Sequence, residues 1–288
     1  MRLKRMIAFC AAVAVFTGAY FVELSAKPET DFGLFSWGEN IFERSERKII
    51  KKYIKEANIN EIYQQFNENL IESGKAENFV KYMSRNNVDV YALMGEAEWA
   101  YEPDGESLIN EIRLISNYNK RQNKDGKIKG VMVDVEPHLL EEWVYGEEGL
   151  DILFESYLSC MQNAYEYAVD HNLEFWACIP NSYDDIDYYA LKDLVYSACD
   201  GIAVMNYNRH DEYGQMEGEV ELAQMCGKKV MCIYELQQVG KHSLEDINTY
   251  ANEGIYALWE SARNLENEFN YEGLSFAYHY YEPLKDLL

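Results

Sequence analysis

Eight short apolar segments alternate with longer segments of helical periodicity between residues 31 and 288, and this alternation constrains the fold more than any other feature. Most of the segments are rich in β-branched or aromatic residues and are short enough to be buried strands. Strand–helix alternation implies parallel strands joined by right-handed crossovers, and eight such units in about 255 residues match a closed barrel. The sequence therefore predicts an α/β protein, a single-domain (β/α)8 TIM barrel over residues 31–288. The segments are 33–37, 62–66, 88–94, 130–135, 173–179, 201–205, 229–234 and 273–278.

The alternative architecture is a doubly wound open sheet. No G-x-G-x-x-G follows the first segment, which argues against a nucleotide-binding version of that sheet. Near the C-terminus, apolar residues of helical spacing between Ile247 and Ala262 predict a helix. A Ser243-x-x-Asp246 box predicts where this helix begins, because both side chains can bind free backbone N–H groups.

The N-terminal 26 residues differ in character from the rest of the chain. Arg2, Lys4 and Arg5 precede an apolar run over residues 6–22. A basic start followed by an apolar run is typical of a secretory signal, and this run is also just long enough for an uncleaved membrane anchor. We therefore expect residues 1–26 to be a signal peptide or an N-terminal anchor. The barrel would then be secreted or held on the extracellular side.

Charge and cysteine content exclude several classes of partner. The net charge of −24 disfavours nucleic acid and anionic lipid, so a membrane is expected as a partner only through the N-terminal anchor. Five cysteines follow that segment, an odd number without close pairs, which argues against a disulfide scaffold. There is no C-x-x-C and no H-E-x-x-H. We therefore expect neither a metal nor a cofactor.

Polar and aromatic residues follow the predicted strands, where a barrel places its active site. This rim is rich in carboxylates, amides and aromatic rings and has almost no cations. Such a rim suits a neutral polyol such as an oligosaccharide or polysaccharide, whereas a phosphate would need Arg, Lys or a helix N-terminus. The expected sugar-binding residues are Trp37, Glu96, Trp99, Asn181, Asn206, Asn208, Gln237, Tyr278 and His279.

The strongest local feature is the carboxylate pair at the end of the fourth predicted strand. Because side chains alternate along a strand, Asp134 and Glu136 should both point into the mouth of the barrel. Two neighbouring carboxylates oppose each other's ionisation, so one stays protonated near neutral pH, as a general acid must. A structural pair held by arginine or backbone groups is the alternative. We favour catalysis, because two acids in an otherwise apolar strand are costly unless used or paired.

These residues resemble the family 18 glycoside hydrolases, the chitinase-like barrels. That family carries D-x-x-D-x-D-x-E on strand four and M-x-Y-[DN] on strand six. The last two acids fall on Asp134 and Glu136, and the strand-six pair falls on Tyr207 and Asn208. The resemblance implies that Glu136 protonates the glycosidic oxygen. It also implies that Asp134 steadies the acetamido group of the substrate and that Tyr207 hydrogen-bonds the same group.

The chain departs from this family at three places. The first two motif acids fall on Lys129 and Met132, and Ala277 or Tyr278 stands where the family has a strand-eight tryptophan. The fourth and eighth segments also resemble exported barrels of Gram-positive bacteria that have a glycosidase-like fold and no settled activity. The lysozyme-like family 25 shares the D-x-E, but its strand-one aspartate is not evident in residues 35–38.

A second mechanism fits the same carboxylates. Val135-Glu136-Pro137 is similar to the Asn-Glu-Pro of retaining barrel glycosidases of the large four/seven clan. That resemblance implies a nucleophile at the end of strand seven, on Glu235. The two carboxyl groups would then lie about 5–5.5 Å apart.

The sequence thus predicts a glycoside hydrolase-like protein acting on an extracellular or cell-wall polysaccharide, with Glu136 as general acid. Two alternatives remain open. One is a catalytically inactive barrel that binds glycans in the same cleft, and the other is a structural or partner-docking wall protein, because fold does not dictate function.

Overall fold

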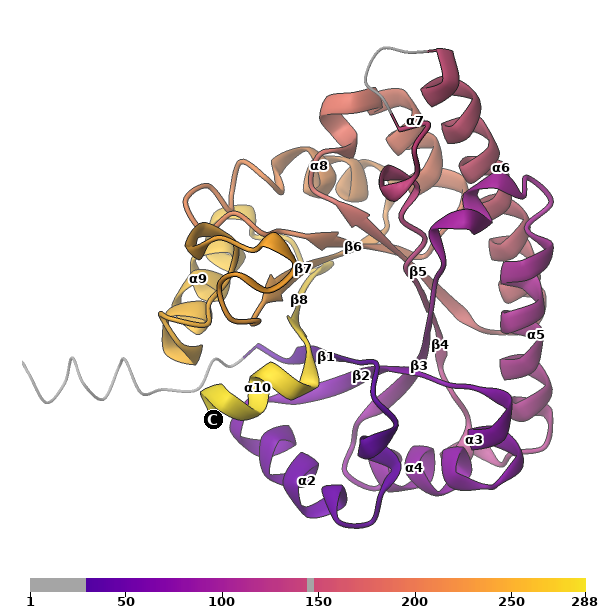
Figure 1. Cartoon of the computed structure of the whole chain (residues 1–288), viewed down its shortest axis with the longest axis vertical. Helices are drawn as coiled ribbons and strands as arrows, with labels where there is room; N and C mark the ends of the chain where they lie inside the picture. Colours follow the sequence, from indigo (N-terminus) through magenta and orange to yellow (C-terminus); the bar gives the residue numbers. More distant parts are fainter. Residues whose placement is uncertain (1–29, 144–147) are drawn as a thin grey trace, which may run out of the picture.

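A computed structural model of the chain describes residues 30–143 and 148–288, so the predicted N-terminal segment 1–26 lies outside the described residues. Eight parallel strands close into a barrel in sequence order, and the last strand pairs with the first (Figure 1). Each strand overlaps its predicted segment, which confirms the (β/α)8 barrel. The strands are β1 (Phe32–Ser36), β2 (Ile59–Gln65), β3 (Asp89–Met94), β4 (Gly130–Val133), β5 (Glu174–Pro180), β6 (Gly201–Met205), β7 (Lys229–Glu235) and β8 (Leu274–His279).

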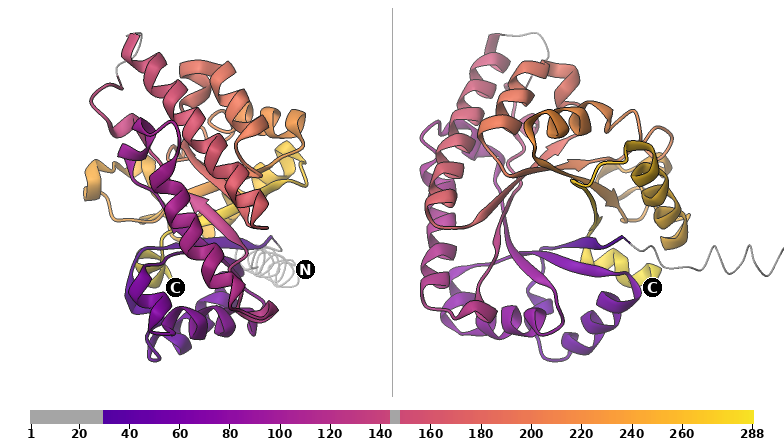
Figure 2. Two further views of the ribbon diagram at one scale, coloured as in Figure 1. Left: turned by 90° about the vertical axis from the view of Figure 1, so that its right-hand side faces the viewer. Right: turned by 180° about the vertical axis from the view of Figure 1, so that it is seen from behind.

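Helices form an outer layer around the strands, as the side and rear views show (Figure 2). They bury their apolar faces against the barrel, as Ile50 and Tyr53 of α2 (Glu46–Glu56) illustrate. No helix in the described ranges is both long and apolar enough to cross a membrane. The helices are α2 (Glu46–Glu56), α3 (Glu68–Glu72), α4 (Lys75–Ser84), α5 (Glu106–Lys120), α6 (Glu148–Asp170), α7 (Tyr183–Ser197), α8 (Glu217–Cys226), α9 (Ile255–Phe269) and α10 (Tyr281–Leu287).

The core has two layers because side chains alternate along each strand. Outward residues such as Val133 and Val204 pack beneath the helices. Inward residues fill the barrel, so that it is a packed core rather than a pore. The buried inward residues are Phe35, Tyr63, Tyr91, Leu93, Met132, Trp176, Cys178, Ala203, Met231, Ile233 and Ala277.

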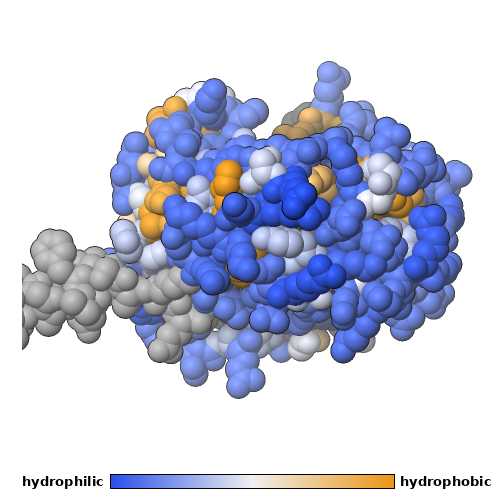
Figure 3. Space-filling view, turned by 90° about the horizontal axis from the view of Figure 1, so that it is seen from below, coloured by the Kyte–Doolittle hydropathy of each residue, from blue (hydrophilic) through white to orange (hydrophobic). Residues whose placement is uncertain are grey.

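A polar network lies at the N-terminal end of the barrel. Tyr63 donates to Glu61 at 2.6 Å, and Glu61 lies 3.6 Å from the Lys129 ammonium. On the other side, Glu174 pairs with Lys229 at 2.5 Å. These opposite charges satisfy one another beside a pocket of ≈ 530 Å³ at that end of the barrel. Figure 3 shows the molecule from below relative to Figure 1, and this face is mostly hydrophilic with scattered apolar residues.

The predicted start of the last long helix is wrong. The helix α9 begins at Ile255, and the segment before it forms short 3-10 turns rather than a helix. Ser243 and Asp246 do not form the capping box; the reciprocal pair is Glu245 and Asn248, which caps a single 3-10 turn. Side-chain hydrogen bonds in the turn engage backbone N–H groups that an α-helix would otherwise use. The α-helix therefore begins later in the chain than the apolar spacing predicts.

Backbone packing fixes the position of the residue that follows β4. The Asp134 N–H donates to the Met94 carbonyl at 2.8 Å. The next residue of that neighbouring segment is Gly95, where an added Cβ would lie 1.9 Å from the Asp134 carbonyl oxygen. Only a residue without a side chain allows the two segments to approach this closely. Gly95 therefore sets where Asp134 leaves the strand.

We expect Gly95→Ala to lower the free energy of unfolding by about 3 kcal/mol, because backbone must move to admit the methyl group. Gly74→Ala is the control, since Gly74 has φ +74° and open space around its Cβ position. It should cost only about 1 kcal/mol, the penalty of a side chain in the left-handed region. Urea unfolding of both variants measures the difference. Equal losses would contradict the close packing at Gly95.

Candidate active site

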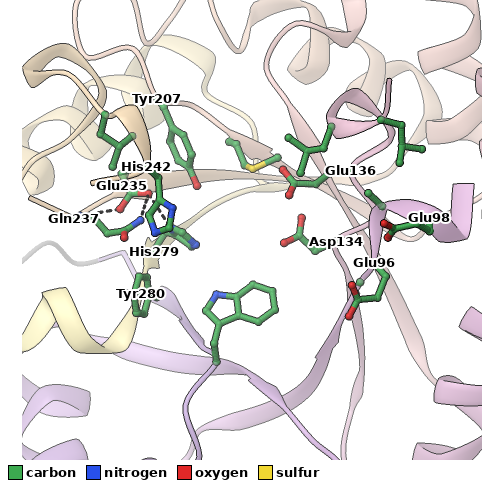
Figure 4. Close-up of a pocket in the computed structure, with 17 residues that line it drawn as sticks. Glu96, Glu98, Asp134, Glu136, Tyr207, Glu235, Gln237, His242, His279 and Tyr280 are labelled. Atoms are coloured by element: carbon green, nitrogen blue, oxygen red, sulfur yellow. Dashed lines mark hydrogen bonds and ion pairs between the residues drawn. The ribbon is translucent and has the colours of Figure 1, made fainter. Parts of the chain in front are cut away.

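A pocket of ≈ 820 Å³ opens at the C-terminal end of the barrel (Figure 4). Its volume is in the range of ligand sites in proteins. Residues that follow β1, β3, β4, β6, β7 and β8 line it, so it lies where barrel enzymes place their chemistry. The predicted site residues that the structure brings together here are Trp37, Glu96, Asp134, Glu136, Tyr207, Glu235, Gln237 and His279.

Two predicted sugar-binding residues point away from the pocket. Tyr278 is fully buried beneath the helices, where its hydroxyl accepts from Trp259 at 2.7 Å and donates to the Ala57 carbonyl at 2.9 Å. Asn206 is buried and donates to the Glu212 carbonyl at 2.9 Å. Each is one residue away from an inward-facing position, and strand alternation turns it to the other face.

Three further predicted residues also lie outside the pocket lining. Trp99 packs against the core beneath the helices. Asn208 lies in the loop after β6, where its side-chain oxygen accepts from the His210 N–H at 3.2 Å. Asn181 is half-buried in the turn between β5 and α7. No residue that follows β5 lines the pocket in the described part of the chain.

The pocket also contains residues outside the predicted set of catalytic and sugar-binding residues. Glu98 and Tyr280 follow β3 and β8, and their positions after a strand were the signal for them. Leu139 belongs to the 3-10 helix η4 (Pro137–Leu139), which directly follows the acid pair. His242 and Leu244 come from the loop after β7. Nothing in the sequence indicated that this loop folds back over the mouth.

Asp134 and Glu136 both reach the pocket from the end of β4, as their spacing predicts. Burial raises the pKa of Glu136 to about 7, with a further contribution from the charge of Asp134 and an opposing one from His279. Burial also raises the pKa of Asp134, against the charge of His279 and a hydrogen bond from Cys178. The Asp134 Oδ1 atom is buried without a hydrogen-bond partner among the described residues. The pair can therefore retain a proton near neutral pH.

His138 lies beside the acid, with its Nε2 atom 3.4 Å from the Glu136 Oε1. Its ring meets the edges of Trp143 and Tyr183 at centroid distances of 6.2 and 6.3 Å. Burial lowers the pKa of His138, so the ring is neutral at neutral pH and does not hold Glu136 as an anion.

Tyr207 faces the acid pair from β6, and Figure 4 shows its ring extending toward Glu136. Burial raises its pKa well above the usual range, and the nearby charges of Glu235, Asp134 and Glu136 act in the same direction. Its hydroxyl therefore keeps its proton and is available as a hydrogen-bond donor.

Glu235 and His279 form a hydrogen bond because β7 and β8 place them in register. His279 Nδ1 lies 2.8 Å from Glu235 Oε2. Leu236 and Gln237 donate backbone N–H bonds to Glu235 Oε1 at 2.8 and 2.7 Å, and the Gln237 amide donates to Oε2 at 3.2 Å. Burial would raise the pKa of Glu235, but His279 and the Gln237 donors outweigh burial and lower it.

The residues that occupy the missing motif positions in this chain have other structural roles. Lys129 lies in the network at the bottom of the barrel, where it pairs with Asp89 at 2.9 Å. Met132 belongs to the apolar interior beneath Asp134. Ala277, not Tyr278, faces inward on β8. Within the described residues, no cluster of histidine, cysteine, aspartate or glutamate side chains is arranged to hold a metal ion.

Comparisons with known proteins identify the fold. No protein-family model and no curated protein sequence matches the chain. Among solved structures, it is similar to a chitinase from Bacteroides thetaiotaomicron, with 14% identity over 90% of this chain and 94% of that one and a TM-score of 0.55. A GH18 chitinase from Pseudoalteromonas aurantia gives 12% identity, 86% and 93% coverage and a TM-score of 0.53.

A GH99 endo-alpha-mannosidase from Bacteroides thetaiotaomicron is similar to a comparable extent, with 10% identity, coverage of 88% and 84% and a TM-score of 0.53. The chain shares the barrel fold of these glycoside hydrolases. At such low identities the likeness establishes the architecture, and the chemistry must be argued from this chain's own residues.

We expect Asp134→Asn to lower the pKa of Glu136, because a neutral amide no longer opposes ionisation of its neighbour. A fall of about one pH unit, or about 1.4 kcal/mol, is the expected size. Carbon-13 NMR of the labelled glutamate carboxyl groups measures it. Glu98→Gln is the control, since Glu98 is exposed at the pocket rim. An unchanged Glu136 titration in Asp134→Asn would show that the two carboxylates are not coupled.

Proposed function

We propose that this protein is a glycoside hydrolase acting on an extracellular or cell-wall polysaccharide, with Glu136 as its general acid. One observation carries the proposal: Glu136 lies in a large pocket at the catalytic end of a barrel, and its pKa is raised to about 7. A carboxylic acid that is still partly protonated at neutral pH can give its proton to a glycosidic oxygen. The fold shared with glycoside hydrolases agrees with this assignment.

Asp134 and Tyr207 would assist on the sugar side of the acid. In the arrangement that the family resemblance implies, they hold the acetamido group of an N-acetylated sugar. Both face the same pocket as Glu136. Tyr207 keeps its proton and can donate to the acetamido oxygen, and the Asp134 carboxylate, which lines the pocket, can accept from the amide N–H.

The walls of the pocket suit a sugar ring. Trp37, Tyr207 and Tyr280 supply aromatic surface, and Gln237 and Glu96 supply polar groups for hydroxyls. No lysine or arginine is among the lining residues in the described ranges. A neutral glycan is therefore a better ligand for this pocket than a phosphorylated one.

Glu235 does not have the environment of a nucleophile. Its two oxygens already accept hydrogen bonds from Leu236, Gln237 and His279, and its exposed fraction is 2%. An attack on an anomeric carbon would require it to give up some of these bonds. We therefore favour a positioning role for Glu235 over the two-carboxylate retaining route.

A barrel that binds glycans without cleaving them is the second candidate. The observation that favours it is Met132, an apolar residue where the family motif has an acid beneath Asp134. Tight glycan binding without turnover by the wild-type protein would distinguish this function from hydrolysis.

We also propose that residues 1–26 export the chain, as a cleaved signal or as an anchor that leaves the barrel outside the cell. The acidic charge of −24 supports a glycan partner over nucleic acid.

Glu136→Gln should lower the rate of hydrolysis about 10²–10⁴-fold, because the amide keeps the shape of the side chain but cannot protonate the leaving group. Activity of the wild type should fall above pH 7, where Glu136 loses its proton. Reducing-end release from a panel of N-acetylated and non-acetylated oligosaccharides measures both effects. Glu155→Gln on the exposed surface of α6 is the control. Equal rates for Glu136→Gln and wild type would exclude Glu136 as the acid.

A further inference from the structure

Buried Glu235 and half-buried His279 form a pair that borders the same pocket, and the chemistry proposed above gives His279 no part. We propose that His279, held by Glu235, is the general base that activates the hydrolytic water, so that the enzyme inverts the anomeric configuration. This inference rests on the glycoside hydrolase function proposed above. It adds the base and the stereochemical outcome, neither of which the acid pair determines.

The strand order places His279 opposite the acid. In a closed barrel of eight strands in sequence order, β4 and β8 lie on opposite sides. Glu136 follows β4 and His279 ends β8, and Figure 4 shows the two side chains on opposite sides of the pocket. An inverting hydrolase needs this arrangement, with the acid and the base on opposite faces of the sugar and room for one water.

The contacts of Glu235 define which nitrogen of His279 can act. Glu235 is ionised, because its pKa is lowered, and it therefore accepts from the Nδ1 of His279 at 2.8 Å. When the ring is neutral its single proton is then on Nδ1, and Nε2 carries a free lone pair. Because Nδ1 faces the carboxylate, Nε2 is left to meet the pocket that His279 lines. A carboxylate that orients an imidazole and stabilises its protonated form is the arrangement used by hydrolytic bases.

The surroundings of His279 restrict its movement. Its ring packs against Tyr280, Phe35 and Tyr207 at centroid distances of 5.2, 6.0 and 6.1 Å. Glu235 is held by backbone N–H groups as well as by the imidazole. Burying a carboxylate costs free energy that apolar packing would avoid, so the pair is better explained by a use than by stability.

The reaction balances without any further reactant. Nε2 of His279 takes a proton from water as the water oxygen forms a bond to the anomeric carbon. The bond from that carbon to the glycosidic oxygen breaks, and Glu136 gives its proton to the departing oxygen. The products are two free sugar hydroxyl ends, a Glu136 carboxylate and a His279 imidazolium. Exchange of one proton with solvent restores both groups.

This mechanism requires a protonated Glu136 and a neutral His279 at the same pH, so the other charges around the imidazole matter. Its own partner Glu235 and the acid pair on the opposite wall interact with it electrostatically. The titratable groups that line the pocket with His279 are Glu96 and Glu98 after β3, Asp134 and Glu136 after β4, Tyr207 after β6, Glu235 on β7, His242 in the loop after β7 and Tyr280 after β8.

The first test needs no substrate. Nitrogen-15 NMR of the histidine-labelled protein, with the His279 signal assigned by its loss in His279→Gln, should show Nδ1 protonated and Nε2 bare at pH 7. Glu235→Gln should weaken this preference for Nδ1, since an amide can donate as well as accept and no longer requires a proton on that nitrogen. A His279 that is doubly protonated from pH 6 to pH 8 could not act as a base, and the proposal would be overturned.

The second test uses any oligosaccharide that the wild type cleaves. Proton NMR of the first product anomer should show inversion. His279→Gln should lower kcat about 10²–10³-fold with little change in KM and should remove the acidic limb of the pH profile. Glu235→Gln should lower kcat in the same sense, and His210→Gln on the exposed loop after β6 should retain full activity.

The two proposals fail in different ways. One possible outcome is retention of configuration, with activity lost in Glu136→Gln but kept in His279→Gln. This result would support the glycoside hydrolase function and would exclude His279 as the base. Absence of hydrolysis of every glycan would remove both proposals together.

Discussion

The burial of two carboxylates at the end of one strand, with the charge of Asp134 acting on Glu136, determines most of what this barrel can do. Asp134 and Glu136 face the same way, and the backbone around Asp134 is fixed by Met94 and by the close approach of Gly95. The two acids therefore cannot separate, and burial leaves little water to screen them. Keeping one proton on the pair has the lowest free energy near neutral pH. Glu136 is less deeply buried than Asp134 and is therefore more accessible to a ligand. The ability of Glu136 to donate a proton near neutral pH thus follows from its packed surroundings, since an exposed glutamate would be ionised at that pH.

The fold could be predicted because the pattern that encodes it is local. Strand length, helical spacing and their alternation each depend on neighbouring residues, and together they define eight parallel units. The inward direction of Asp134 and Glu136 could be predicted too, because polar residues in an apolar strand reveal its phase. The same reasoning did not place Tyr278. Phe276, Ala277 and Tyr278 are all apolar or aromatic, and a strand buried on both faces gives no sign of which residue points inward.

The rest of the site depends on contacts between distant segments. Glu235 and His279 meet only because the β7–β8 register makes them partners, and no spacing in the sequence encodes that register. His242 and Leu244 reach the pocket through a loop whose 3-10 turns end before α9, where apolar spacing alone predicted a continuous helix. Loop conformation is set by side-chain hydrogen bonds such as the Glu245–Asn248 cap, which periodicity does not report.

The departures from the chitinase-like motif change where the charge of the site is controlled. In the motif, further acids stand below the catalytic pair on the same strand. Here Met132 and Lys129 occupy those positions, one in the apolar interior and one in the network at the opposite end. A charge on His279, across the pocket, lowers the pKa of both Asp134 and Glu136, against burial, and His279 is itself held by Glu235. A proton on the β4 wall is therefore coupled to a proton on the β8 wall. Coupling between opposite walls is what a sugar bound between them would experience, so protonation and substrate position must be considered together in this pocket.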